Sequence, residues 1–136
     1  MPFTILVIDD DSAILEMATE LLASDGYRAV AAVGGEEGLT QARAVNPDLI
    51  LLDYHMPRMD GLAVIQRLKA NAATRRIPVV ALTSGSAEQA NELSRAGCVA
   101  FIPKPFSPAE FLGAVAEFVK ATAGRSRRDE PHSKLD

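Results

Sequence analysis

The chain has 136 residues, of which 14 are Lys or Arg and 18 are Asp or Glu, so its formal net charge is −4. That length suits one compact domain, since single domains commonly run to about 100–150 residues, and it is too short for a two-domain enzyme. The acidic balance argues against a surface that coats nucleic acid, and a single cysteine excludes an intramolecular disulfide framework. No apolar run approaches the roughly 18 residues of a membrane span, and the N-terminus lacks a secretory signal pattern, which predicts a cytoplasmic protein.

Five short apolar runs are spaced along residues 5–102. They are rich in Val, Ile and Leu without strict polar alternation, which is typical of strands covered on both faces. The runs are Ile5–Ile8, Arg28–Val33, Leu49–Leu52, Val79–Leu82 and Val99–Ile102.

The segments between the runs have helical spacing. Apolar residues in 14–22 and again in 111–119 recur at i, i+1, i+4, i+7 and i+8, which predicts a single apolar stripe on each helix. Ser107 is placed to cap the last helix, and Gly26 and Gly97 are placed to end the first and the fourth. Five strands alternating with five helices predict a doubly wound α/β fold with a five-stranded parallel sheet.

The last segment differs in composition from the rest. Residues 121–136 are polar, carry a small positive charge and contain one large aliphatic residue, Leu135. Such a segment cannot bury enough apolar surface to order itself. We therefore expect a folded domain over residues 1–120, followed by a tail at 121–136 that is a disordered end, a linker or sequence added for expression.

Polar side chains follow four of the five predicted strands. In an open parallel sheet, ligands bind beyond the carboxyl ends of the strands, so these side chains are expected to share one site. They are Asp9, Asp10 and Asp11 after the first strand, Asp53 after the third, Thr83 and Ser84 after the fourth, and Lys104 between two prolines after the fifth.

This set of groups indicates a particular chemistry. Carboxylates that converge on one point repel each other, and a hard cation such as Mg²⁺, which prefers oxygen ligands, would keep them ionised. A hydroxyl and an ammonium nearby could bind the remaining phosphoryl oxygens, and phosphoryl transfer depends mainly on positioning and positive charge. The sequence therefore predicts a Mg²⁺-dependent phosphoryl site with a carboxylate as acceptor.

Four motifs in this order resemble those of the receiver domain of two-component response regulators, the CheY-like superfamily. The resemblance covers residues 3 to about 120. The motifs are Ile8-Asp9-Asp10, Asp53-Tyr54-His55-Met56-Pro57 with Asp60-Gly61, Ala81-Leu82-Thr83-Ser84, and Lys104-Pro105-Phe106.

The resemblance implies a role for each matching residue around the acceptor. Asp53 would accept a phosphoryl group from a phosphohistidine on a partner kinase. Asp10 and Asp53 would ligate Mg²⁺ directly, Asp9 would act mostly through water, and the backbone carbonyl of His55 would add a further oxygen. Lys104 would pair with the phosphoryl group.

The resemblance also implies how the signal leaves the site. Thr83 would follow the phosphoryl oxygen, and Phe101 would change rotamer as Thr83 moves; Phe101 stands where Tyr is common, so an output through a phenolic hydroxyl is not expected. The family further implies strand order 2-1-3-4-5, as in flavodoxin-like folds, and a cis peptide bond at Lys104–Pro105. The surface that switches would be formed by the fourth helix, the fifth strand and the fifth helix.

The expected partners are a sensor histidine kinase or histidine phosphotransfer protein and a downstream protein target, with no direct nucleic acid and no membrane. A homodimer that forms on phosphorylation is a further possible partner arrangement. The first reading is a stand-alone signalling switch that assists only its own phosphorylation and dephosphorylation. A receiver fragment of a larger regulator or hybrid kinase, and a pseudo-receiver binding module without chemistry, are the alternatives.

An aspartyl-phosphate hydrolase is a further alternative, because Asp9-x-Asp11 resembles the haloacid-dehalogenase pattern. Ala13 stands where Thr or Val is expected there, no acidic pair follows Lys104, and the chain leaves no room for a cap domain. We rank this enzyme below the switch and the pseudo-receiver.

Several residues have simpler structural explanations. Ser12 offers a cap for the first helix, which leaves Asp11 as an extra charge at its N-terminus. Cys98 is expected to be a small buried residue, and Gly85 to leave one side of the site open to water. The predicted helix at 86–96 has only a thin apolar stripe, and weakly anchored elements are those that move.

Overall fold

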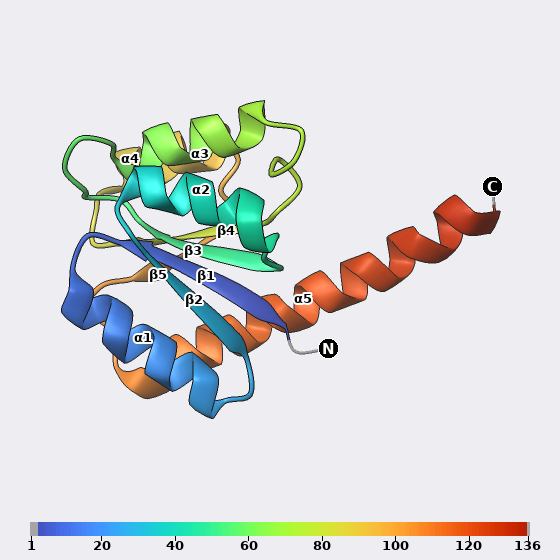
Figure 1. The fold of residues 1–136 in the computed structure, drawn as a ribbon, viewed down its shortest axis with the longest axis horizontal. Coiled ribbons are helices and arrows are strands. Elements are labelled where there is room, and N and C mark those ends of the chain that lie inside the picture. The colour runs from blue at the N-terminus through green and yellow to red at the C-terminus, as the bar shows by residue number, and fades with distance from the viewer. Residues whose placement is uncertain (1–2, 136) are drawn as a thin grey trace. The chain divides into compact units, whose positions relative to one another are not determined.

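A computed structural model describes the backbone of residues 3–135 and the side chains of residues 3–122. Within residues 3–135, five strands alternate with five helices (Figure 1), as the sequence predicts. In chain order they are β1 (Thr4–Asp9), α1 (Ser12–Ser24), β2 (Arg28–Val33), α2 (Gly35–Val45), β3 (Leu49–Asp53), α3 (Gly61–Ala70), β4 (Val79–Thr83), α4 (Ala87–Ala96), β5 (Ala100–Pro103) and α5 (Pro108–Leu135).

The strands form one parallel sheet in the order β2-β1-β3-β4-β5, which confirms the expected topology. β1, β3 and β4 occupy the three central positions and every one of their residues is buried. Burial on both faces explains their continuous apolar sequences, since neither face of these strands meets water. The edge strand β2 is largely exposed or half-buried, and Val33 at its end is 53% exposed.

The sheet and helices α1 to α4 lie in a first compact unit that ends at Pro105. α1 covers one face of the sheet and α2, α3 and α4 cover the other (Figure 1). The buried stripe of α1 consists of Leu15, Ala18 and Leu22, which confirms the predicted apolar face. On the opposite face, alternate strand residues such as Ile8 and Leu52 join one core cluster with residues of α2, α3 and α4.

Helix α1 is capped by a different residue from the expected one. The side chain of Asp11 accepts hydrogen bonds from the backbone N–H of Ala13 at 2.9 Å and of Ile14 at 3.4 Å, and Ser12 is already the first helical residue. The expectation that Ser12 caps the helix was wrong, because a cap must precede the helix in extended backbone, and Asp11 does so. Asp11 thus has a structural task apart from the site.

The other predicted helix ends are confirmed. Gly26 and Gly97 both adopt positive φ values, 92° and 119°, where an L side chain would be strained. At the start of α5, the Ser107 hydroxyl accepts from the backbone N–H of Glu110, and the Glu110 carboxylate accepts from the backbone N–H of Ser107, at 3.1 and 2.8 Å. This reciprocal pair is the capping box that the sequence indicates.

Helix α5 belongs to a second compact unit that begins at Phe106. Its bounds, Pro108–Leu135, run into the segment 121–136 that the sequence predicts to be a disordered tail. The side chains of residues 123–136 lie outside the described part of the chain, so the domain boundary at residue 120 stays a prediction. Among the described residues, no helix has both the length and the apolar character needed to cross a membrane.

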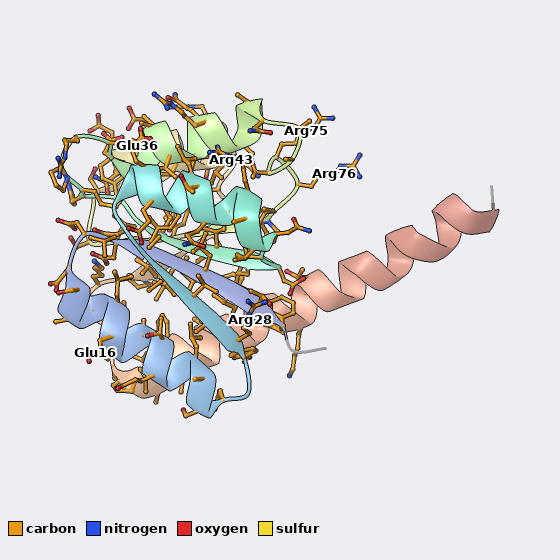
Figure 2. All side chains as sticks on the ribbon, in the orientation of Figure 1. Glu16, Arg28, Glu36, Arg43, Arg75 and Arg76 are labelled. Atoms are coloured by element: carbon orange, nitrogen blue, oxygen red, sulfur yellow. The ribbon has the colours of Figure 1, made fainter. Side chains whose placement is uncertain are left out.

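Charged side chains lie on the outer surface of this fold. Glu16, Glu36 and Arg43 are exposed on helices α1 and α2, and Arg75 and Arg76 extend from the loop between α3 and β4 (Figure 2). Cys98, by contrast, is only 7% exposed, as expected, and burial raises the pKa of its thiol above the ordinary value. A protonated, buried thiol is a packing residue here.

Helix α4 is anchored by little apolar surface. Of its residues only Leu93 is buried, which confirms the thin stripe that the sequence shows. Leu93 lies in the core cluster shared with α2 and α3. Because few buried contacts hold this helix, its local opening should require less free energy than that of the central strands.

Replacing Leu93 by Ala should therefore destabilise the fold by about 2–4 kcal/mol and loosen α4 in particular. Urea unfolding gives the first quantity, and amide hydrogen exchange over residues 87–96 gives the second. Leu62→Ala, at a half-buried position of α3 packed against the same cluster, is the matched control. Equal exchange rates in α4 for both variants would contradict the assignment of Leu93 as its anchor.

Candidate functional site

The strand register brings the predicted site residues to one edge of the sheet. Ile8 pairs with Leu52, and Asp53 pairs with Leu82, so Asp9 and Asp53 end neighbouring strands. Thr83 in turn pairs with Pro103, and the backbone N–H of Lys104 donates to the carbonyl of Thr83 at 3.0 Å. Parallel strands separated by about 4.8 Å place such terminal side chains within reach of one another.

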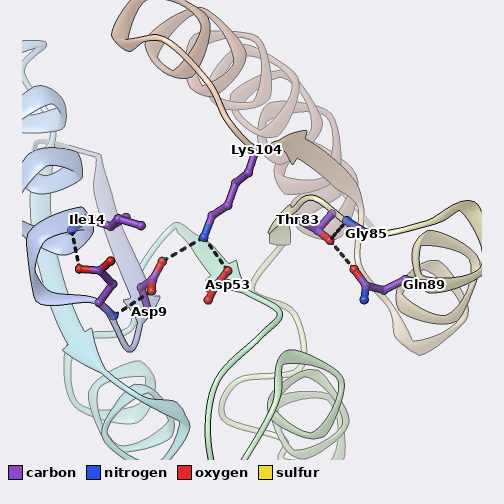
Figure 3. A network of polar contacts seen from close by, with 8 residues as sticks. Asp9, Ile14, Asp53, Thr83, Gly85, Gln89 and Lys104 are labelled. Carbon is purple, nitrogen blue, oxygen red and sulfur yellow. Dashed lines mark hydrogen bonds and ion pairs between the residues drawn. The ribbon is translucent and has the colours of Figure 1, made fainter.

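Lys104 lies between two buried carboxylates (Figure 3). Its Nζ atom donates a hydrogen bond to Asp53 Oδ1 at 2.7 Å and lies 3.5 Å from Asp9 Oδ2. Asp9 is 1% exposed and Asp53 is 5% exposed. The peptide bond between Lys104 and Pro105 is cis, as the family resemblance implies.

The pKa values of Asp9 and Lys104 are both raised, which favours the neutral form of Asp9 and the charged form of Lys104. Burial raises the pKa of Asp9 above its ordinary value, and the nearby charge of Asp53 raises it further, although the N–H of Asp11 and the charge of Lys104 oppose the shift. For Lys104, burial alone would lower the pKa, but its hydrogen bond to Asp53 and the charges of Asp53 and Asp9 outweigh burial and raise it. Lys104 is therefore fully charged, whereas the negative charge of Asp9 is poorly compensated.

The carboxylates form a cluster that could hold a cation. One oxygen from each of Asp9, Asp10 and Asp53 lies within 4.8 Å of the others. Within the described residues, Asp9 Oδ2 is a buried side-chain atom without a hydrogen-bond partner, and it lies 3.5 Å from Lys104 Nζ. A buried oxygen of this kind beside two further carboxylates fits a hard divalent cation.

The loop after Asp53 is shaped by a close backbone approach. The N–H of Gly61 donates to the carbonyl of Tyr54 at 2.8 Å, and a Cβ on Gly61 would come within 2.9 Å of the Asp53 carbonyl oxygen and of Tyr54 Cα. Asp60 caps α3 by accepting from the N–H of Ala63. The Asp60-Gly61 motif thus fixes the loop against Asp53. The His55 side chain is exposed, and the role of its carbonyl stays a prediction.

The Thr83 hydroxyl makes its hydrogen bonds on the side away from Asp53. Its hydroxyl donates to Oε1 of Gln89 in α4 and accepts from the N–H of Gly85 at 2.9 Å (Figure 3). The expectation that Gly85 leaves this side open to water was wrong, because the Gln89 carboxamide occupies that space. Phe101 is half-buried in β5 and packs against the core cluster.

Gln89 is the residue that sequence reasoning missed. Ser86-Ala87-Glu88-Gln89 has the spacing of a capping box, in which the Gln side chain would return to the N–H of Ser86. Ser86 does cap α4, by accepting from the N–H of Gln89 at 3.3 Å. The Gln89 side chain binds Thr83 instead. The Gln89 side chain can reach Thr83 only because the fold places the start of α4 beside the end of β4, and the spacing of residues in the sequence does not reveal this.

Comparison with known proteins identifies the family. The model of the response regulator receiver domain matches residues 5–116, and the chain belongs to that family. The chain is 32% identical over 120 residues to the polar-differentiation response regulator DivK of Brucella anthropi, a match that covers 88% of this chain and 98% of that protein. The resemblance inferred from the four motifs is thereby confirmed.

Solved structures agree with this assignment. The chemotaxis protein CheY4 of Vibrio cholerae superimposes with a TM-score of 0.82 at 27% identity, over 86% of this chain and 98% of that one. The receiver domain of the sensor histidine kinase PA1611 of Pseudomonas aeruginosa gives a TM-score of 0.78 at 26% identity, over 88% and 99%. That second structure has a magnesium ion coordinated in its active-site cleft.

The raised pKa of Asp9 predicts how the effect of Mg²⁺ depends on pH. A raised pKa in the folded state means that the protonated Asp9 carboxyl favours the metal-free fold. That contribution is fully present below the ordinary pKa of 3.8, and it is lost as the pH rises through the raised pKa. Mg²⁺ bound by this cluster would compete with the proton for the same oxygens. Its stabilising effect should therefore be small near pH 4 and grow toward pH 7, reaching about 2.7 kcal/mol at a hundredfold excess over Kd.

Thermal unfolding from pH 4 to pH 8, with Mg²⁺ or with a chelator, measures this effect. Asp9→Asn should remove most of the Mg²⁺-dependent gain, whereas Asp25→Asn, the same chemical change at the exposed C-cap of α1, should keep it. A gain of the same size at every pH would show that the cation binds elsewhere.

Proposed function

We propose that this chain is a phosphoacceptor switch of two-component signalling. Asp53 would receive a phosphoryl group from the phosphohistidine of a sensor histidine kinase or a histidine phosphotransfer protein. The observation that carries the proposal is the buried Asp53 carboxylate, 2.7 Å from Lys104 Nζ and clustered with Asp9 and Asp10 at the carboxyl edge of a receiver-domain sheet. Hydrolysis would return the protein to its starting state.

The transfer exchanges one bond to phosphorus for another. An oxygen of Asp53 attacks the phosphorus as the phosphorus–nitrogen bond breaks, and the bonding electron pair returns to the imidazole ring. The three phosphoryl oxygens carry negative charge throughout, so stabilisation comes from positioning and from nearby positive charge. Lys104 supplies one such charge, because its ammonium already lies at Asp53 and has three protons to donate.

A divalent cation fits the remaining need for positive charge. Asp10 and Asp53 would hold Mg²⁺ directly, Asp9 mostly through water, and the carbonyl of His55 would supply a further oxygen. When bound, Mg²⁺ neutralises carboxylate repulsion and binds a phosphoryl oxygen. The unpartnered, buried Asp9 Oδ2 supports this ligand set, as does the magnesium ion in the related PA1611 receiver domain.

Output would depend on a shift between two arrangements of the same fold. Thr83 would move to the phosphoryl oxygen on Asp53, Phe101 would change rotamer, and a downstream protein would bind the altered surface. The weak anchoring of α4 supports this route, since Leu93 alone of its residues is buried. Elements that rearrange cheaply are held by few buried contacts.

Intact mass spectrometry tests the acceptor directly. Incubation with Mg²⁺ and acetyl phosphate should add one phosphoryl group to the wild-type protein, and chelation of Mg²⁺ should prevent the addition. Asp53→Asn should abolish it, because the amide oxygen is a poor nucleophile, whereas Asp48→Asn should leave it unchanged; Asp48 is an exposed carboxylate just before β3. Persistent phosphorylation of Asp53→Asn would reject Asp53 as the acceptor.

Hydrogen exchange tests where the signal goes. Binding of Mg²⁺ and beryllofluoride, a stable phosphoryl mimic, should change amide protection across residues 86–106 more than across the exposed edge strand β2. The reason is that α4 and β5 connect Thr83 to Lys104 along the chain. Unchanged protection over residues 86–106, with beryllofluoride bound, would exclude this segment as the switching surface.

A further inference from the structure

The hydroxyl of Thr83 already has a partner in α4. It donates its proton to Oε1 of Gln89 and accepts a hydrogen bond from the N–H of Gly85. A threonine hydroxyl has one proton, so it can donate to only one acceptor at a time. While Gln89 holds that proton, the hydroxyl cannot donate to a group on Asp53.

The surroundings of Gln89 are fitted to this contact. A Cβ atom on Gly85 would overlap the carboxamide of Gln89, at both its oxygen and its nitrogen. Gly85 does not need the backbone freedom of glycine, because its φ is not in the positive range that other residues avoid. The absence of a side chain at residue 85 therefore leaves room for the Gln89 carboxamide beside Thr83.

A role for Gln89 in helix capping alone does not explain its direction. In a capping box its side chain would accept from the N–H of Ser86, at the start of the same helix. Instead it reaches out of α4 to the end of β4. The contact therefore ties the first turn of α4 to the sheet, in a helix that has only Leu93 buried.

We propose that Gln89 is a positioning residue that holds Thr83 in the unphosphorylated arrangement and releases it on phosphorylation. This inference rests on the proposed phosphoacceptor function. The hydroxyl would exchange the Gln89 oxygen for a phosphoryl oxygen on Asp53, and the first turn of α4 would lose its tie to β4. Gln89 thus sets how readily the switch turns on and links that step to the movement of α4.

The proposal predicts the effect of removing the acceptor while keeping the length of the side chain. Gln89→Met preserves helix propensity but cannot accept the hydroxyl proton. The Gln89→Met variant should bind beryllofluoride with Mg²⁺ about two- to tenfold more tightly than the wild type. That factor corresponds to one neutral hydrogen bond, the Thr83–Gln89 bond that stabilises the unmodified arrangement of the wild type. Gln89→Glu keeps an acceptor oxygen and should show no such gain.

Titration followed by the NMR signal of the Gly85 amide measures these affinities, because that N–H donates to the Thr83 hydroxyl. Gln66→Met, the same change at an exposed position of α3, is the matched control and should bind like the wild type. In a Thr83→Val background, Gln89→Met should have no further effect on affinity. If Gln89→Met acted only by destabilising α4, it would change the affinity equally in the wild-type and Thr83→Val backgrounds.

The outcomes separate the two proposals. Tighter binding by Gln89→Met that vanishes in Thr83→Val supports the positioning role. Equal affinity of Gln89→Met and wild type, or a gain that persists in Thr83→Val, overturns that role and leaves the phosphoacceptor function intact. Failure of the wild type to bind beryllofluoride at all would overturn the phosphoacceptor function and the role of Gln89 with it.

Discussion

The structure depends on two carboxylates that the sheet forces together with one ammonium group between them. Asp9 and Asp53 end neighbouring buried strands, and Lys104 reaches both. A single positive charge cannot compensate two buried negative charges, and Asp10 adds a third carboxylate at the rim. Burial raises the pKa of Asp9, and the charges of Asp53 and Asp10 raise it further. The edge of the sheet therefore carries an excess of negative charge that could bind a divalent cation.

Residues next to the carboxylate cluster stabilise the fold without joining the cluster. Asp11, adjacent to the cluster, has its carboxylate engaged with two backbone N–H groups of α1, so it stabilises a helix and does not add to the cluster. Gly61 holds the following loop against Asp53 through backbone contacts alone. Neither residue adds an unsatisfied polar group to the carboxylate cluster, because both satisfy their own polar groups locally.

Much of this could be predicted from the sequence, for a physical reason. Strand periodicity and the residues that follow each strand can be identified from local sequence. Parallel pairing then brings the ends of these strands to one edge of the sheet, so the sequence could predict that Asp9, Asp53, Thr83 and Lys104 lie near one another. The Ser12 expectation failed by one residue in where the helix begins, whereas the Gly85 expectation failed because tertiary structure fills the space beside that glycine. Asp11 has the extended backbone that a cap requires, and the space beside Gly85 is filled by a side chain from the next helix. Gln89 was missed for the same reason as the space beside Gly85: its spacing from Ser86 suggests a capping box, and only the fold turns its side chain toward Thr83.

The number of protons on each polar group decides which residue can act as a switch. In the proposed reaction Lys104, which has three protons to donate, could bind Asp9, Asp53 and a phosphoryl oxygen together, so its contacts need not change between the two states. Thr83 has a single proton and must choose between acceptors. Under the proposal, this choice between two partners would produce two discrete arrangements. The partner that Thr83 has in this structure, Gln89, lies on α4, which has only Leu93 buried. In the proposed switch, the coupling between Asp53 and the surface of α4 would follow from the single proton of the Thr83 hydroxyl.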